Sequence, residues 1–190
     1  NRKRYHDQQI EPEKLMELSD LARCVGGRVA FISDKNKVRE VAHIVSTGEK
    51  LALENKSIHD FLFSHITWTK EEDEKRHGFF IDTFEFNVLQ KTMFRLFRNW
   101  NILKFFLSLG ISRLIVKDIR NIHLTSAAFG AIIIPHDSDE DYLKTGILLE
   151  RLWLTAHKLG LSLQPTTTVH FIGARVRAED SKGIASGHQK

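Results

Sequence analysis

The sequence contains little cysteine and no long apolar segment. Cys24 is the one cysteine among 190 residues, so no disulfide can form within the chain, as is typical of proteins from a reducing compartment. No stretch approaches the roughly 20 consecutive apolar residues that a membrane-spanning helix needs. Asn1 to Arg4 contain neither an initiator methionine nor the apolar region of a signal peptide. We therefore expect a cytoplasmic protein without a membrane segment.

Several familiar site motifs are also missing. Ten histidines are present, but none lies in a His-Glu-x-x-His motif or beside a Cys-x-x-Cys pair, so we expect no metal site. Gly26-Gly27 is neither a Walker loop nor a Gly-x-Gly-x-x-Gly dinucleotide motif. No Gly-x-Ser-x-Gly elbow surrounds a serine nucleophile. The sequence thus indicates no catalytic side chain.

What the chain does have is enough apolar material for one globular core. Its hydrophobic content is 42%, which suits a single domain of this length. The 28 basic residues are spread among 24 acidic ones, and aromatic residues such as Phe61 and Phe94 occur at core spacing, so nucleic acid is not an expected partner. The densest cationic cluster is Arg2-Lys3-Arg4, which is either a solvated tail or a site for phosphate oxygens.

Hydrophobic periodicity predicts a mixture of helices and strands. We expect helices over residues 11–23, 35–53, 57–66, 82–100, 101–109 and 142–159. We expect strands over residues 28–33, 111–116, 126–134, 161–163 and 168–172. Thr69 and Glu72 predict a short capped helix before Gly78, whereas Gly48 is expected to weaken the second helix. Residues 126–134 are apolar enough for the centre of a sheet. The helix over 142–159 is apolar around much of its circumference, so it should be deeply buried or shared with a partner subunit.

The first fifteen residues, from Asn1 to Leu15, resemble the opening of nitroreductase-family proteins. That opening reads Ser-x-Arg-x-Phe, a short spacer, an aliphatic residue and then a helix; Tyr5 takes the aromatic place and Ile10 the aliphatic one. The resemblance implies that Lys3 touches the edge of a flavin ring and that Asn1 lies near the flavin phosphate. Arg2 and Arg4 would add positive charge to the same site.

A second segment, Gly146 to Thr167, resembles the family's long buried helix, its closing Gly-Leu and the loop that follows. By this resemblance the residues Gln164, Pro165, Thr166 and Thr167 line the isoalloxazine ring, and a peptide N–H of the loop donates a hydrogen bond to flavin N5. Read from the residues alone, Pro165 could instead mark a plain β-bulge.

The likeness extends more weakly over nearly the whole chain. It implies one nitroreductase-like domain over residues 1–190, a fragment lacking its extreme N-terminus and a C-terminal segment. The expected fold is an α+β sandwich with a mainly antiparallel central sheet flanked by helices. It would form a homodimer through long helices, with FMN at the interface. NAD(P)H would reduce the FMN, which would then reduce a small-molecule electron acceptor such as a nitroaromatic or a quinone.

Two features leave alternatives open. The segment from Ile66 to Thr83 resembles nitroreductase-like domains of large bacterial proteins that also carry an adenylating, ThiF-like domain. The family's Asn-x-Gln-Pro-Trp stretch after the first helix is absent, because Arg23 to Arg28 pass directly into a strand. The alternatives are therefore a catalytically idle domain that binds or stores flavin and a dimerisation domain of a larger ThiF-like protein.

Overall fold

The computed structural model describes residues 4–6, 8–25, 27–76 and 78–177. These residues form a mixture of helices and short strands, so the expected α+β class is confirmed at this coarse level. Contacts within the chain group it into a first unit, Asn1–Val45 with Asp118–Thr166, and a second unit, Ser46–Lys117 with Thr167–Lys190. The expected single nitroreductase-like domain stays a prediction.

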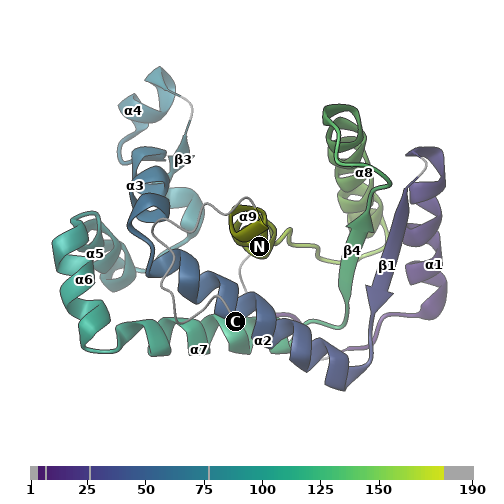
Figure 1. Ribbon diagram of the computed structural model, residues 1–190, viewed down its shortest axis with the longest axis horizontal. Helices are drawn as coiled ribbons and strands as arrows, with labels where there is room; N and C mark the ends of the chain where they lie inside the picture. The colour runs from purple at the N-terminus through teal and green to yellow at the C-terminus, as the bar shows by residue number, and fades with distance from the viewer. Residues whose placement is uncertain (1–3, 7, 26, 77, 178–190) are drawn as a thin grey trace. The chain divides into compact units, whose positions relative to one another are not determined.

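The first unit combines a small sheet with helices (Figure 1). Its own elements are α1 (Pro12–Asp20), the 3-10 helix η1 (Leu21–Val25), β1 (Arg28–Ile32), β4 (Phe129–Ile133) and α8 (Asp139–Lys158). Two further helices contribute residues to both units: α2 (Lys35–Leu53) and α7 (Ile111–Leu124). The predicted helices at 11–23 and 142–159 and the predicted strand at 28–33 are therefore confirmed, with shifted ends.

The sheet of the first unit is an antiparallel pair. Arg28 lies opposite Ile133, and Ile32 lies opposite Phe129. A Cβ atom at Gly130 would approach the ring of Phe31, its partner in the register, to 2.8 Å, so glycine leaves room for that ring. Among the described residues β4 has one neighbour, β1. The expectation that residues 126–134 lie at the centre of a sheet is therefore wrong.

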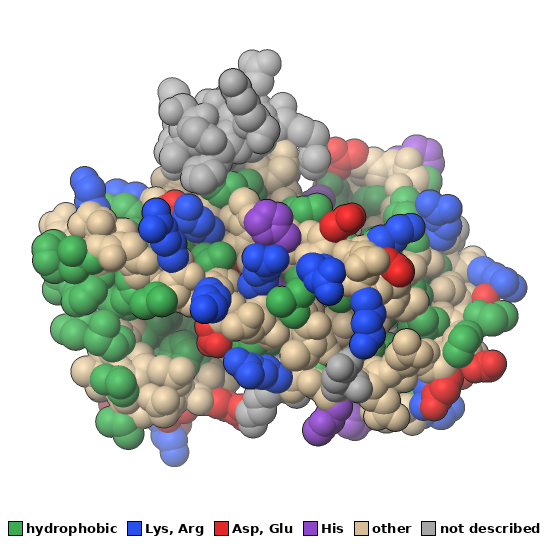
Figure 2. All heavy atoms as spheres, turned by 90° about the horizontal axis from the view of Figure 1, so that it is seen from below, with side chains coloured by type: hydrophobic (Ala, Val, Ile, Leu, Met, Phe, Trp, Pro, Cys, Tyr) green, Lys and Arg blue, Asp and Glu red, His purple; other side chains and the backbone are tan. Residues whose placement is uncertain are grey.

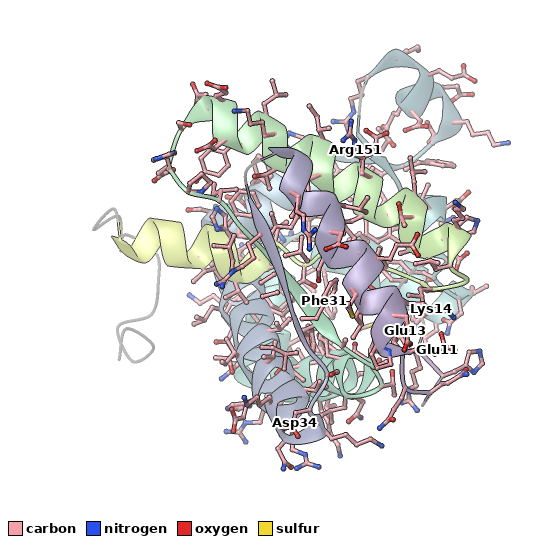
Figure 3. All side chains as sticks on the ribbon, turned by 90° about the vertical axis from the view of Figure 1, so that its right-hand side faces the viewer. Glu11, Glu13, Lys14, Phe31, Asp34 and Arg151 are labelled. Carbon is pink, nitrogen blue, oxygen red and sulfur yellow. The ribbon has the colours of Figure 1, made fainter. Side chains whose placement is uncertain are left out.

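The core of the first unit lies between α1, η1, β1 and α8. Figure 3 shows α1 in front of β1, with Glu11, Glu13 and Lys14 labelled at its first turn and Arg151 on α8 behind it. Leucine, alanine and valine side chains fill the space between these elements and are almost fully buried. These side chains are Leu18, Ala22, Val29, Leu148, Leu152 and Ala156.

Both ends of α8 follow from the local sequence. The Ser138 side chain accepts a hydrogen bond from the Asp141 N–H at 3.2 Å, and the first turn carries Asp139, Glu140 and Asp141. These carboxylates are favourable at the positive end of the helix dipole. At the other end Gly160 adopts a left-handed conformation with φ of 73°, which glycine tolerates without steric cost. The cap and the glycine fix where the helix begins and ends.

The second unit is mainly helical. Its elements are α3 (Lys56–Ser64), β2 (Ile66–Thr67), α4 (Lys70–Lys75), β3 (Phe79–Phe80), the 3-10 helix η2 (Ile81–Phe84), α5 (Val88–Phe97), α6 (Trp100–Ser108) and α9 (Thr168–Arg177). β2 and β3 form a two-residue parallel pair. Thr69 caps α4 by accepting a hydrogen bond from the Glu72 N–H, as predicted.

Aromatic side chains hold the second unit together. Phe94 of α5 lies at the centre of a group of rings, with centroids 4.9 Å from Phe63 and 5.2 Å from Phe86. Trp68 adds its ring at 6.0 Å from Phe94, and the Arg98 guanidinium lies 5.7 Å from the Trp68 ring centroid. Such tilted pairs stabilise a core beyond the area they bury. Phe94 therefore belongs to a core, as its spacing predicted, whereas the same prediction is wrong for Phe61, which is 66% exposed.

The predicted strand at residues 111–116 is wrong, because these residues begin the helix α7. Ser112 is buried and Ile115, Val116 and Ile119 are partly buried, whereas Leu114 is 69% exposed. Spacings of three and four residues are those of a helix that buries one side. A short apolar run is ambiguous between strand and buried helix, and here the longer period continues to Leu124.

The predicted last strand is also wrong. Residues 161–167 have no regular structure, and residues 168–172 belong to α9. Thr168 and Val169 favour strands by propensity, but the Phe171 N–H donates to the Thr167 carbonyl at 3.1 Å in a helical turn. Tertiary context therefore overrides a weak local preference.

Two helix predictions need smaller corrections. Gly48 does not weaken α2, which is continuous from Lys35 to Leu53; a Cβ atom at 48 would lie 2.9 Å from Val169 Cγ2, so this glycine allows close packing. The helix expected from residue 82 begins at Val88, where Asn87 and Gln90 form a capping box. The helices predicted at 57–66 and 101–109 are confirmed as α3 and α6.

None of the described helices is both long and apolar enough to cross a membrane.

Candidate functional site

The N-terminal part of the candidate site begins at Arg4, because Asn1, Arg2 and Lys3 lie outside the described residues. The Arg4 guanidinium is 3.9 Å from the Asp118 carboxylate, and both side chains are exposed. The next residue is more firmly held, since the Tyr5 N–H donates to Thr125 Oγ1 at 3.0 Å. Burial raises the pKa of the Tyr5 phenol above its ordinary value, so this side chain stays neutral at pH 7. The segment therefore starts against the C-terminal half of α7.

The second part of the candidate site is the irregular segment after α8. Leu161 and Leu163 pack against the core of the first unit. Gln164 and Pro165 are half-buried, whereas Thr166 and Thr167 are exposed. Gln164, Pro165 and Thr166 belong to the first unit and Thr167 begins the second.

Backbone donors of this segment are free. Within the described part of the chain, no group accepts a hydrogen bond from the N–H groups of Leu163, Gln164 or Thr166. Leu161 is different, because its N–H donates to the Ala156 carbonyl at 2.8 Å. Backbone N–H groups are strong donors that are normally satisfied when they are buried. The segment can therefore donate to a ligand or to water without losing a protein hydrogen bond.

The structure does not join the two parts of the site. Arg4 and Gln164 to Thr166 share the first unit, but no hydrogen bond or ion pair joins them among the described residues. The assignment of Arg4, Gln164, Pro165, Thr166 and Thr167 to one ligand stays a prediction. Among the described residues, His, Cys, Asp and Glu side chains form no group of three or more that could hold a metal ion.

One side of α8 is exposed and apolar. Leu143, Ile147 and Leu154 lie at helical spacing on the side away from Leu148 and Leu152, and are 67%, 44% and 66% exposed. An open hollow of about 480 Å³ adjoins them, lined by Gly146, Leu149, Glu150, Trp153 and Leu154. The helix is buried on its core side and exposed on this one, so the alternative that a partner subunit shares this side stays a prediction.

A buried histidine forms the main polar network of α3. His59 is 5% exposed; its Nε2 lies 2.8 Å from the Phe97 carbonyl oxygen and its Nδ1 lies 3.1 Å from an Asp60 carboxylate oxygen. Asp60 also accepts a hydrogen bond from Lys56 at 2.5 Å. The Lys56 ammonium and the His59 ring hold the pKa of the Asp60 carboxyl below its ordinary value. The network links α3 to the end of α5.

The lowered pKa predicts acid sensitivity. Because the pKa of Asp60 is lower in the folded state, its contribution to stability is full above the unfolded pKa of about 4 and is lost as the pH falls through the folded pKa. We expect the plot of melting temperature against pH to be flatter for Asp60→Asn than for the wild type below about pH 4. Thermal melts between pH 2 and 6 test this, and parallel curves would contradict it. Asp34→Asn, which removes a carboxylate that caps α2, is the control for loss of a charge.

Sequence reasoning missed one group of polar residues. Ser112 and Arg113 lie in the first turn of α7, beside Lys50 of α2. The strand predicted over residues 111–116 is incompatible with a helix N-terminus at this place. The signal was present: a glycine precedes Ile111, and a serine follows it.

The chain matches no model of a protein family, no curated protein and no solved structure.

Proposed function

We propose that the chain is a flavin-binding domain of the nitroreductase type, which reduces a nitroaromatic, a quinone or a similar acceptor. When bound, FMN supplies the redox chemistry by accepting a hydride from NAD(P)H and passing electrons to the acceptor. The likeness of residues 1–15 and 146–167 to the family motivates this proposal. The carrying observation is the segment after α8, whose free backbone donors suit the polar edge of a flavin ring.

The residues present fit the two ends of such a cofactor. Gln164 and Thr166 offer N–H groups that have no acceptor in the described part of the chain, and neither has a positive φ. Arg4 offers an exposed guanidinium whose ion pair with Asp118 is long, at 3.9 Å. A weak, solvated ion pair is readily exchanged for a phosphate. Lys3 is proposed to stabilise negative charge on the reduced ring.

The first experiment is the visible spectrum of the purified chain with FMN. Under the proposal the chain retains FMN after gel filtration, and NAD(P)H bleaches the absorbance near 450 nm, a value typical of oxidised flavins. Retained flavin that NAD(P)H does not bleach would support storage rather than turnover. A colourless protein after addition of FMN would contradict the proposal.

A backbone variant tests the segment itself. Thr166→Pro removes one N–H that bonds to no described group, so no described hydrogen bond is lost, whereas a hydrogen bond to the flavin would be; circular dichroism checks that the variant folds. We expect the dissociation constant for FMN to rise about tenfold, the equivalent of one hydrogen bond of about 1.4 kcal/mol. Thr166→Ala keeps the N–H and should bind like the wild type. Flavin fluorescence titration measures both.

If Thr166→Pro and Thr166→Ala bind FMN equally, the N–H of residue 166 does not contact the ring. The FMN affinities of Gln164→Pro and Gln164→Ala then test the free N–H of residue 164 in the same way. Lys3→Ala should lower flavin retention or the rate of reduction, and an unchanged value of both would remove Lys3 from the site.

The second candidate function is a dimerisation domain within a larger ThiF-like protein. The exposed apolar stripe of α8, formed by Leu143, Ile147 and Leu154, favours it, because such a surface gains stability when a partner covers it. The proposed occupant is a second copy of the chain. A dimer that retains no FMN would support this candidate over the first.

A charge in the stripe should prevent association. We expect Ile147→Glu to raise the dissociation constant of a homodimer at least tenfold, because a carboxylate is costly to bury in an apolar interface. Met16→Glu is the matched control, since Met16 is an exposed apolar residue on α1, at 66%. Sedimentation equilibrium of both variants measures the change. An equal effect of the two substitutions would exclude α8 as the interface.

A further inference from the structure

An open hollow in the second unit lies where α6 ends and α7 begins. Its volume is about 300 Å³, and its surface is mainly polar. Figure 2 shows Lys and Arg side chains on the face of the molecule that carries α2 and α7. The hollow is lined by Lys50, Glu54, Leu107, Ser108, Leu109, Gly110, Ser112 and Arg113. None of these residues belongs to the proposed flavin site.

The first turn of α7 follows the hollow's Gly110 and carries backbone N–H groups without a described acceptor. Gly110 has φ of 84°, which lets the chain leave α6 and start a new helix. The Arg113 N–H donates to the Gly110 carbonyl at 3.1 Å, whereas the N–H groups of Ile111 and Ser112 have no acceptor within the described ranges. α7 has 14 residues, so the dipole of a full helix adds positive potential at its first turn.

The side chain of Ser112 provides independent support. Ser112 is 4% exposed and lines the hollow, and its hydroxyl makes no hydrogen bond with any described group. Ser108, on the other side of the turn, differs: it is exposed, and its Oγ donates to the Phe105 carbonyl at 2.6 Å. Ser112 is therefore a nearly buried polar residue on the lining of the hollow, and its hydroxyl has no described partner to give up.

The charges around the hollow favour an anion. Lys50 and Arg113 contribute two positive charges and Glu54 one negative charge, so the lining side chains carry a net charge of +1. The Lys50 ammonium lies 3.9 Å from the Glu54 carboxylate, a long pair that leaves the ammonium able to turn to another acceptor. A guanidinium such as that of Arg113 can bind two oxygens of one phosphate.

We propose that this hollow binds the phosphate group of a small phosphate monoester. The N–H group and the hydroxyl of Ser112 donate to its oxygens, and Arg113 and Lys50 neutralise its charge. Glu54 opposes the anion and holds Lys50, so it limits the affinity. The proposal is independent of flavin binding, because every residue that carries it lies in the second unit.

The experiment is a titration of the full chain with inorganic phosphate at constant ionic strength, followed by amide resonances in NMR and by calorimetry. We expect saturable binding that shifts the amide signals of residues 111–113. Ser112→Ala should weaken binding at least fivefold and Arg113→Gln at least tenfold. Glu54→Gln should tighten it about threefold. Ser108→Ala is the matched control and should bind like the wild type.

The outcomes separate clearly. Shifts that saturate with phosphate and are weakened by Ser112→Ala, but not by Ser108→Ala, support the site. Equal affinities of the wild type, Ser112→Ala and Arg113→Gln overturn it, as does an equal response to chloride at the same ionic strength. If Ser112→Ala fails to fold, Arg113→Gln decides, because Arg113 is exposed. A glycerol phosphate that binds no more tightly than inorganic phosphate overturns the assignment to a monoester.

Discussion

Replacing Leu148 with alanine should lower the free energy of unfolding by about 2–5 kcal/mol. Leu148 is 1% exposed and contributes to the core between α1, β1 and α8. The truncation removes buried apolar area and leaves a cavity that the neighbouring Leu152 and Val29 fill only in part. Urea denaturation followed by circular dichroism measures the change.

The matched control for this change is Leu154→Ala on the same helix. Leu154 is 66% exposed, so the same three carbon atoms are lost from a position that water already reaches. We expect a change within about 0.5 kcal/mol for the monomer. A similar loss for both variants would mean that α8 does not bury the side that the structure assigns to the core.

Gly78→Ala should destabilise the protein by about 2–3 kcal/mol, the cost typical of forcing an extra methyl group into a packed site. A Cβ atom at residue 78 would lie 2.6 Å from the His65 carbonyl oxygen and 2.9 Å from Thr67 Cγ2. The first of these contacts is with backbone, which cannot turn away as a side chain can. Because the Phe79 N–H donates to the same His65 carbonyl at 2.7 Å, the pairing of β2 with β3 is disturbed as well.

Gly146→Ala is also a glycine-to-alanine substitution, but it should stabilise the protein. Gly146 lies inside α8, and a Cβ atom there meets nothing within 4 Å. Alanine is the better helix former by about 1 kcal/mol, so this variant should be more stable than the wild type. Thermal melts measure both variants. If both substitutions change the melting temperature in the same direction, the contact at Gly78 is not the cause of the effect of Gly78→Ala.

Much of the helical structure could be predicted from the sequence. Long periodic patterns with clear ends were correct, as for α8, where Ser138 caps one end and Gly160 terminates the other. The cap formed by Thr69 was also predictable. Local hydrogen-bonding groups and glycine conformations decide these boundaries, and both are visible in the sequence.

The errors came from short apolar runs. Residues 111–116 and 168–172 contain β-branched residues, but both form helices. In a run of five or six residues, periods of 2 and 3.6 can hardly be told apart. Packing partners distant in sequence decide the outcome, as in the contact that a Cβ at Gly48 would make with Val169. Those partners are not visible in a local pattern.

For the candidate site, the position along the chain could be predicted but the hydrogen bonding could not. The position of Gln164 to Thr167 just after a terminated helix could be expected from Gly160 and Pro165. The free N–H groups of Gln164 and Thr166 could not, because hydrogen-bond satisfaction depends on the fold. The first turn of α7 was missed with the helix itself, and with it the buried Ser112 hydroxyl.

The pairing of β1 with β4 leaves an open ribbon. In an antiparallel pair, every second residue of each strand turns its N–H and C=O away from the partner. Five residue pairs form this ladder, and the outward-facing groups on either border are a template to which another extended segment can add. Within the part of the chain that the structure describes, each border of the ribbon therefore carries backbone donors and acceptors that its own ladder does not use.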